Sequence, residues 1–259
     1  GISFSLSLLR GWLAELRFTR ILAAVLLANL ASLVVLNSFG LRPAHLLVTY
    51  PLALGGFGWL LAQARVRRAR LEAPGWLIGC ALAFALFLTV PRLPYLLEWL
   101  PGNTVLAQAD DWGRLSELVS MTLSERYPLR HFANQDYLFS HYYTALYPMA
   151  FFKTCLPVLT LKDAIVAGNA LYHLLLALSL LEVSLRWFAS LRRAALFYFL
   201  CTLFGGFDWL FHARQLFSHA EFWPREVFGA KREISSYFTG MYWVVHHFTA
   251  FYSVAMALA

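Results

Sequence analysis

The sequence predicts an all-α membrane protein, a polytopic bundle of about six transmembrane helices with a large helical loop on its outer side. Of the 259 residues, 60% are hydrophobic and only 14% are charged, whereas soluble domains carry about 25% charged residues. The apolar residues also gather in runs of about 20, the length that a helix needs to cross a bilayer. This composition excludes a disordered chain, a nucleic-acid-binding arm and a small disulfide scaffold.

Six apolar runs are the candidate transmembrane helices. In chain order they are residues 18–37, 45–63, 75–90, 164–185, 194–210 and 242–259. The second contains Pro51 and a glycine-rich stretch that would let a neighbouring helix approach closely. The chain stops inside the sixth run with no closing basic cluster, so we expect the C-terminal part of a longer protein to be missing.

One further run, residues 137–160, has the length of a span but contains His141, Lys153 and two prolines. If it crossed the membrane, the arginines at 186–193 would lie on the opposite face from those near the N-terminus. That arrangement would contradict the excess of Lys and Arg that cytoplasmic loops carry. We therefore interpret this run as a helix that lies in, or dips into, the outer interface.

With that interpretation, three arginine clusters share one face of the membrane. They are Arg10, Arg17 and Arg20; Arg65, Arg67, Arg68 and Arg70; and Arg186, Arg192 and Arg193. This face holds ten arginines and three glutamates, and therefore the whole formal net charge of +7. The positive-inside rule makes it the cytoplasmic face and places the N-terminus inside. The net charge thus indicates orientation, and no nucleic-acid partner is expected.

The chain is thereby divided into three parts. Transmembrane helices occupy 1–90, an outer loop with interfacial helices occupies 91–163, and further transmembrane helices occupy 164–259, with a second outer loop at 211–241. The first loop contains seven of the 14 acidic residues. Because long loops on a rigid scaffold commonly carry functional sites, we expect a site on the outer face.

Asp110 and Asp111 are the candidate catalytic residues of the first loop. They open a predicted helix that continues to Leu123, and one carboxylate is enough to cap its N-terminus. Arg114, three residues after Asp111, lies on the same face of that helix. The pair combines a carboxylate able to act as a general base with a cation able to hold a phosphate. The alternative is an ordinary surface ion pair.

Tyr142, Tyr143 and Lys153 are candidate ligand-binding residues of the same loop. Tyrosine offers both a stacking surface and a hydroxyl group, which suit a sugar or a lipid-linked ligand. The alternative is an amphipathic face seated among lipid headgroups. In the last apolar run, one of the adjacent His246 and His247 is a candidate for lining a cavity while the other packs, because an imidazole within a span is costly unless it has a partner.

The order of these motifs resembles a family of bacterial multi-pass membrane proteins. The resemblance rests on the runs DDW at 110–112, YP at 127–128, YY at 142–143, GGFDW at 205–209, HAEFW at 219–223 and WVVHH at 243–247. That family is similar to the GT-C superfamily of integral membrane glycosyltransferases. This chain departs from it in two respects. Relatives tend to carry Trp-x-Pro-Gln-His where WVVHH stands, and one span, instead of three, usually precedes the acidic loop.

The resemblance implies a GT-C-like bundle that transfers a sugar, with inversion, from a polyprenyl-phosphate donor to an acceptor on the outer face. Asp111 or Asp110 would take the proton of the acceptor hydroxyl. His247 would line the donor groove. Some members of the superfamily use a divalent cation, for which the paired carboxylates would supply oxygen ligands. The departing lipid phosphate would be held by an arginine: Arg114, Arg126 or Arg130.

The resemblance also implies the bacterial cytoplasmic membrane as the location, with the site facing the periplasm and the cell envelope. The implied partners are membrane lipids, the polyprenyl-phosphate sugar, and an acceptor glycan, lipid or protein. A second hypothesis, from a different class, is a non-catalytic GT-C-like subunit. Such a subunit would scaffold a larger complex through contacts with other membrane subunits.

Overall fold

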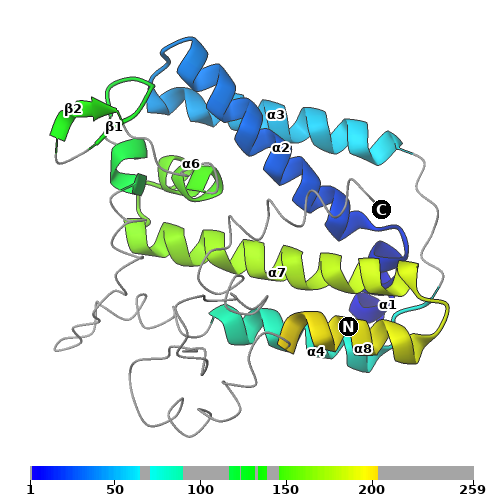
Figure 1. The fold of residues 1–259 in the computed structure, drawn as a ribbon. Coiled ribbons are helices and arrows are strands. Elements are labelled where there is room, and N and C mark those ends of the chain that lie inside the picture. The colour runs from blue at the N-terminus through cyan, green and yellow to red at the C-terminus, as the bar shows by residue number, and fades with distance from the viewer. Residues whose placement is uncertain are drawn as a thin grey trace, which may run out of the picture.

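The structure is a computed structural model that describes residues 2–64, 71–89, 117–122, 124–131, 134–138 and 146–203. The chain in these ranges is mainly helical (Figure 1). The helices are α1 (Ile2–Ala14), α2 (Arg17–Ser38), α3 (Leu46–Gln63), α4 (Gly75–Thr89), α6 (Tyr147–Cys155), α7 (Leu161–Trp187) and α8 (Leu191–Leu203). A short 3-10 helix, Pro43–His45, precedes α3, and β1 (Arg130–His131) pairs antiparallel with β2 (Asn134–Leu138). The predicted helical class is confirmed, with this small β pair as an unpredicted addition.

Three of the described helical segments are long and apolar enough to cross a bilayer: Arg17–Ser38, Pro43–Gln63 and Leu161–Trp187. They coincide with three of the predicted spans. α4 has 15 residues, which make about 22 Å of helix. α8 has 13 residues and covers the part of the run 194–210 that the structure describes, residues 194–203. The predicted span 242–259 lies outside the described residues, and α1 was not predicted.

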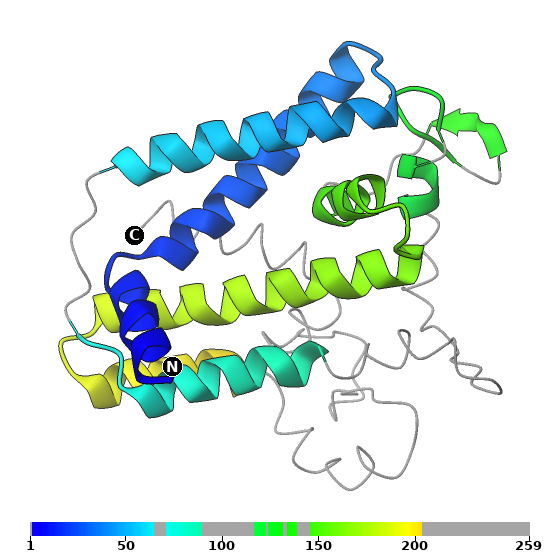
Figure 2. The same ribbon diagram turned by 180° about the vertical axis from the view of Figure 1, so that it is seen from behind.

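α7 is the central helix of the described bundle. In its most apolar 18-residue window 78% of the residues are buried, whereas the corresponding share is 39% for α2 and 11% for the segment containing α3. Figures 1 and 2 show α2 and α3 on one side of α7, and α4 and α8 on the other. Because α3 is apolar all round and exposes Val48, Leu52, Trp59 and Leu60, it has the character of a membrane helix and not of a surface helix in water.

The N-terminus of α7 is fixed by a reciprocal cap. The hydroxyl oxygen of Thr160 accepts the backbone N–H of Asp163 at 3.1 Å, and the carboxylate of Asp163 accepts the backbone N–H of Thr160 at 2.8 Å. This capping box satisfies two N–H groups that the helix itself leaves unpaired. One of the seven acids of the loop 91–163 therefore has a structural role.

The run 137–160 does not form one spanning helix. β2 ends at Leu138, α6 contains nine residues, and the chain from Leu156 to Thr160 is not helical. A helix of that length measures about 13 Å, so α6 is too short to cross a bilayer. Both views show α6 nearly end-on, between α3 and α7 (Figures 1 and 2). This agrees with the interpretation that the run does not cross.

α6 is more deeply packed than an interfacial helix. Its first turn is buried, and Met149 lies so close to α7 that a Cβ added to Gly168 would be 2.3 Å from its Cγ atom. Tyr147 is also buried in the core. The expectation of a helix seated among headgroups thus needs correction for its N-terminal half, because the glycine in α7 lets α6 pack directly on that helix.

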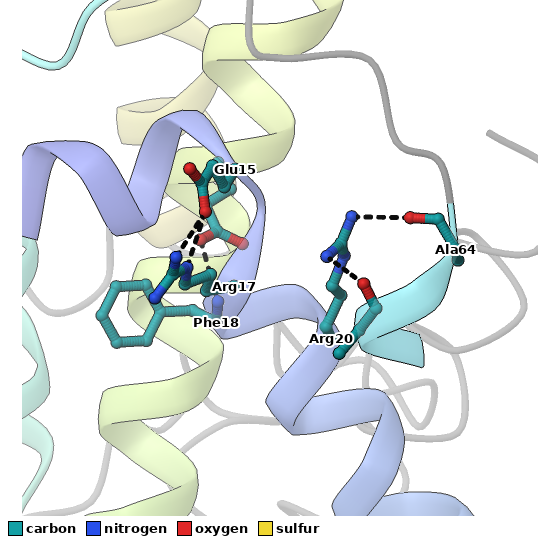
Figure 3. Close-up of polar contacts among 7 residues, drawn as sticks. Glu15, Arg17, Phe18, Arg20 and Ala64 are labelled. Carbon is teal, nitrogen blue, oxygen red and sulfur yellow. Dashed lines mark hydrogen bonds and ion pairs between the residues drawn. The ribbon is translucent and has the colours of Figure 1, made fainter. Parts of the chain in front are cut away.

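The described arginine-bearing helix ends meet at one end of the bundle. Arg20, in the first turn of α2, donates to the carbonyl oxygens of Ala62 and Ala64 at the end of α3, at 3.5 and 3.0 Å. Figure 3 shows this contact and, beside it, the ion pair of Arg17 with Glu15. Arg10 of α1 lies next to Gly75 at the start of α4. The N-terminus of α2, the C-terminus of α3 and the start of α4 are therefore neighbours.

The described parts of the loop 91–163 meet the bundle at the opposite end. The backbone N–H of Tyr127 donates to the carbonyl oxygen of Leu41 at 2.8 Å, in the turn between α2 and α3. Gly40 in this turn has φ +57°, and a Cβ there would lie 3.5 Å from the carbonyl oxygen of Tyr127. The left-handed backbone and the close approach both favour glycine at this position.

Candidate functional site

Most of the residues predicted to carry chemistry fall outside the part of the chain that the structure describes. They are Asp110, Asp111, Arg114, Tyr142, Tyr143 and His247. For Arg130 the structure gives the backbone, which lies in β1. Arg126 and Lys153 are the two predicted site residues whose side chains are described.

Arg126 is exposed at the loop end of the bundle, directly before the buried Tyr127. The hydrogen bond from Tyr127 to Leu41 and the burial of Leu129 anchor the backbone on both sides of Pro128. The guanidinium is therefore carried by a backbone segment that is tied to the bundle. An exposed guanidinium on such a segment is accessible to an anionic ligand that approaches this end of the bundle.

Lys153 has a structural role in the link between α6 and α7. Its ammonium group donates to the carbonyl oxygens of Pro157 and Leu159, at 2.9 and 2.6 Å. Both carbonyls lie beyond the end of α6 at Cys155, so these bonds close the turn that links α6 to α7. The prediction of a ligand-binding lysine did not anticipate this role.

The chain just after the predicted catalytic acids packs into the bundle. Residues 117–122 are helical, and Leu118 and Met121 are fully buried in the core. Glu117 is itself only 6% exposed, although nothing in the sequence distinguished it from the other acids of the loop. A buried carboxylate at the first described residue of this helical segment is a feature of the site region that the sequence did not reveal.

A second set of polar groups lies inside the bundle. Asn29 of α2 donates to the hydroxyl group of Tyr172 of α7 at 2.8 Å, and both residues are buried. One residue along α7, a ring nitrogen of His173 lies 3.1 Å from the hydroxyl group of Thr89, at the end of α4. A polar side chain within a transmembrane helix is energetically unfavourable unless it has a hydrogen-bond partner. The two contacts give such a partner to Asn29, Tyr172, Thr89 and His173. Their presence in apolar runs was the signal that could have identified them.

Glu182 is the most deeply buried acid among the described residues. It was counted with the charges of the arginine-rich face, but it lies within α7 and has no exposed surface. Both of its oxygens accept backbone N–H groups of α2, from Phe18 at 2.9 Å and from Thr19 at 2.7 Å. The carboxylate therefore joins the two helices at the arginine-bearing end.

Within the described residues, no group of three or more His, Cys, Asp and Glu side chains is placed to hold a metal ion. The paired aspartates proposed to ligate a divalent cation lie outside those residues. In comparisons with known proteins, no family model, no curated protein and no solved structure matches this chain.

Proposed function

We propose that this chain is an integral membrane glycosyltransferase that acts at the loop end of its helix bundle. One observation carries the proposal: the described parts of the acid-rich loop 91–163 dock on the end of the bundle opposite to the arginine-bearing end. Cytoplasmic faces of membrane proteins are rich in Lys and Arg. The loop would then face the periplasm, at the surface where lipid-linked sugars and acceptors meet.

The covalent chain keeps the proposed base near the anchored region. Asp111 precedes Glu117 by six residues, a stretch that covers at most about 21 Å. Glu117 belongs to the described helical residues 117–122, which are packed in the core, and Arg126 follows four residues after them. A base and a phosphate-binding cation would therefore be supplied from one loop on one end of the bundle.

In the proposed reaction, the acceptor oxygen forms a bond to the sugar C1 atom while the bond from C1 to the lipid phosphate breaks. Asp111 or Asp110 would accept the hydroxyl proton, and Arg126, with Arg114 or Arg130, would stabilise the negative charge on the departing phosphate. Inversion at C1 follows from attack on the face opposite to the leaving group. The proposed location is the bacterial inner membrane, with the N-terminus in the cytoplasm.

The test is turnover by the purified full chain in liposomes that contain a panel of polyprenyl-phosphate sugars together with acceptor glycans, lipids and peptides, followed as release of polyprenyl phosphate and as sugar transferred to the acceptor. The D110N/D111N double variant keeps the side-chain size and removes the base, so we expect at least a hundred-fold loss, the lower end of what general base catalysis contributes (about 10²–10⁴). Glu125, an exposed acid of the same segment, provides the matched control as E125Q. Unchanged turnover in the double variant would refute the proposed base.

A second candidate function is a non-catalytic subunit of a larger membrane complex. The observation that favours it is α3, whose segment is only 11% buried in its most apolar window. Another transmembrane helix would cover this face as well as lipid does. The liposome assay separates the two candidates, because a scaffold subunit shows no turnover with any donor and co-purifies with partner subunits from the native membrane.

A further inference from the structure

Three arginines at the arginine-bearing end of the bundle have guanidinium groups that the described chain does not use. Arg10 of α1 and Arg192 and Arg193 of α8 are exposed. Their side chains make no hydrogen bond or ion pair with the described residues. Arg17 and Arg20 differ from them, because Arg17 is held in an ion pair and Arg20 donates to the end of α3.

The acids at this end do not neutralise these three arginines. Glu15 is bound to Arg17 at 2.6 Å. Glu182 is buried beside the start of α2, where it accepts two backbone N–H groups. Within the described chain, Glu72 is the one other acid at this end, and it is exposed. The surface therefore has an excess of positive charge that an anionic partner would complement.

Arg10 lies beside an exposed aromatic pair at the start of α4. A terminal nitrogen of its guanidinium is 3.5 Å from the position of a Cβ built on Gly75, and Figure 2 shows α1 next to this end of α4. The following residue, Trp76, is 54% exposed and stacks on Phe199 of α8, with 6.4 Å between the ring centroids. The contacts thus join α1, α4 and α8 in one surface.

α8 continues from its two arginines into an exposed apolar stripe. Leu196 and Leu200 follow Arg192 at intervals of four residues, so the three share one face of the helix. The two leucines are 59% and 44% exposed. From Arg192 to Leu200 the helix rises about 12 Å. A soluble anion would match the arginines alone, whereas a lipid has a charged headgroup for the arginines and acyl chains for the stripe.

We propose that the arginine-bearing end of the bundle binds an anionic phospholipid. The surface that binds it, here called the lipid patch, consists of Arg10, Trp76, Arg192, Arg193, Leu196 and Leu200. The guanidinium groups would hold the phosphate through charge-assisted hydrogen bonds, and the acyl chains would cover the two leucines. Trp76 would lie at the boundary between them, where tryptophan is enriched in membrane proteins. Because the lipid patch and the proposed transfer site lie at opposite ends, this binding does not depend on the proposed reaction.

Native mass spectrometry of the purified full chain tests the preference for an anionic lipid. Phosphatidylglycerol and phosphatidylcholine with the same acyl chains are titrated separately. We expect phosphatidylglycerol to bind at least tenfold more tightly, since each arginine near an anionic lipid surface contributes about fivefold. Equal affinities would overturn the proposal. Glycerol 3-phosphate, which has the phosphate without the chains, should bind more weakly than the lipid, and equal binding would show a site for soluble anions instead.

Single substitutions test whether the lipid patch is responsible. Arg192→Gln should weaken phosphatidylglycerol binding about fivefold, and the triple variant R10Q/R192Q/R193Q should remove most of the preference over phosphatidylcholine. Arg42 is the matched control, because it is also exposed but lies in the turn between α2 and α3, at the loop end. Arg42→Gln should leave the affinity unchanged. An equal loss in Arg42→Gln and Arg192→Gln would overturn the proposal, and so would an unchanged affinity in the triple variant.

Photo-crosslinking locates the bound lipid without any variant. The full chain is placed in phosphatidylcholine nanodiscs that contain a small share of phosphatidylglycerol with a photoreactive acyl chain. We expect labelled peptides that contain Trp76 or Leu196, and an excess of unlabelled phosphatidylglycerol should remove this labelling. Absence of label from both peptides would overturn the proposal, as would labelling there that the excess of phosphatidylglycerol does not reduce.

Discussion

Glu182 in α7 accepts a hydrogen bond of 2.7 Å from the backbone N–H of Thr19 in α2, 163 residues away in the chain. The second oxygen of the carboxylate accepts the N–H of Phe18 at 2.9 Å. α2 follows Leu16, which has φ 55° and offers no side-chain cap. The first N–H groups of a helix lack internal partners. Glu182 therefore caps α2 from a different helix.

Removal of this cap should destabilise the bundle strongly. Glu182→Ala leaves two buried N–H groups without partners, and a buried donor left without its partner costs about 1–3 kcal/mol. We expect a loss of about 3 kcal/mol, measured as the free energy of unfolding in detergent micelles. Glu182→Gln retains a carbonyl acceptor and should lose about half as much.

Glu15 provides the comparison for Glu182. It pairs with Arg17 at 2.6 Å, but both side chains are more than a third exposed, and exposed ion pairs contribute about 0–1 kcal/mol. Glu15→Gln should therefore leave stability nearly unchanged. Equal losses for Glu15→Gln and Glu182→Ala would contradict the capping role.

Much of the fold could be predicted from the sequence because a transmembrane helix requires a continuous run of about 20 apolar residues, which is visible in the sequence itself. The apolar run 18–37 became α2, and the run 164–185 became most of α7. The predicted grouping of the arginines at 10–20 and 186–193 agrees with two contacts at the start of α2. Arg20 donates to a carbonyl oxygen at the end of α3, and Glu182, near the C-terminus of α7, accepts the backbone N–H of Thr19. The β pair was missed, because five residues, Asn134–Leu138, carry no strong alternation of apolar and polar residues.

The site was less predictable because partners far apart in the chain define it. Lys153 was predicted to bind a ligand, and the structure adds two carbonyl partners in the next turn that the sequence could not show. Glu182 was treated as one charge among many, although its contacts with α2 make it structural. The prediction for Asp110 and Asp111 stands as a proposal, since both lie outside the described residues.

Gly168 allows α6 to pack on α7, and an added methyl group should separate them. A Cβ at this position would lie 2.3 Å from the Cγ atom of Met149, and overpacking of this kind costs about 1–3 kcal/mol. We expect Gly168→Ala to lower the unfolding free energy by that amount. Gly168→Ala should cost less in a Met149→Ala background than in the unchanged chain, because the clashing side chain is shortened.

Gly79 in α4 is the matched control for Gly168. Nothing lies within 4 Å of a Cβ added there, and alanine favours a helix over glycine by about 1 kcal/mol. Gly79→Ala should thus be neutral or stabilising. A loss of stability at Gly79 as large as that at Gly168 would show that the close contact with Met149 is not the cause.

The bond from Asn29 to the hydroxyl group of Tyr172 can be tested with a pair of tyrosines. Tyr172→Phe removes a bonded hydroxyl and leaves Asn29 without that partner, so it should cost about 1 kcal/mol. Tyr198 in α8 is equally buried, but its hydroxyl has no partner among the described residues. Tyr198→Phe should cost less than half as much in the same unfolding measurement, and the reverse order would exclude the bond as a source of stability.

The proposed orientation predicts opposite labelling at the two ends of the bundle. Glu125, next to the anchored Tyr127, and Ala189, in the turn between α7 and α8, are both exposed. In a background with Cys80, Cys155 and Cys201 replaced by serine, Glu125→Cys should react with a membrane-impermeant maleimide in spheroplasts. Ala189→Cys should react only after the membrane is opened, because the proposed orientation places this arginine-flanked turn in the cytoplasm. If only Ala189→Cys reacts in closed spheroplasts, the loop 91–163 faces the cytoplasm. If both cysteines react there, the bundle does not lie in a sealed bilayer as proposed. Either result would show that the proposed periplasmic site is wrong.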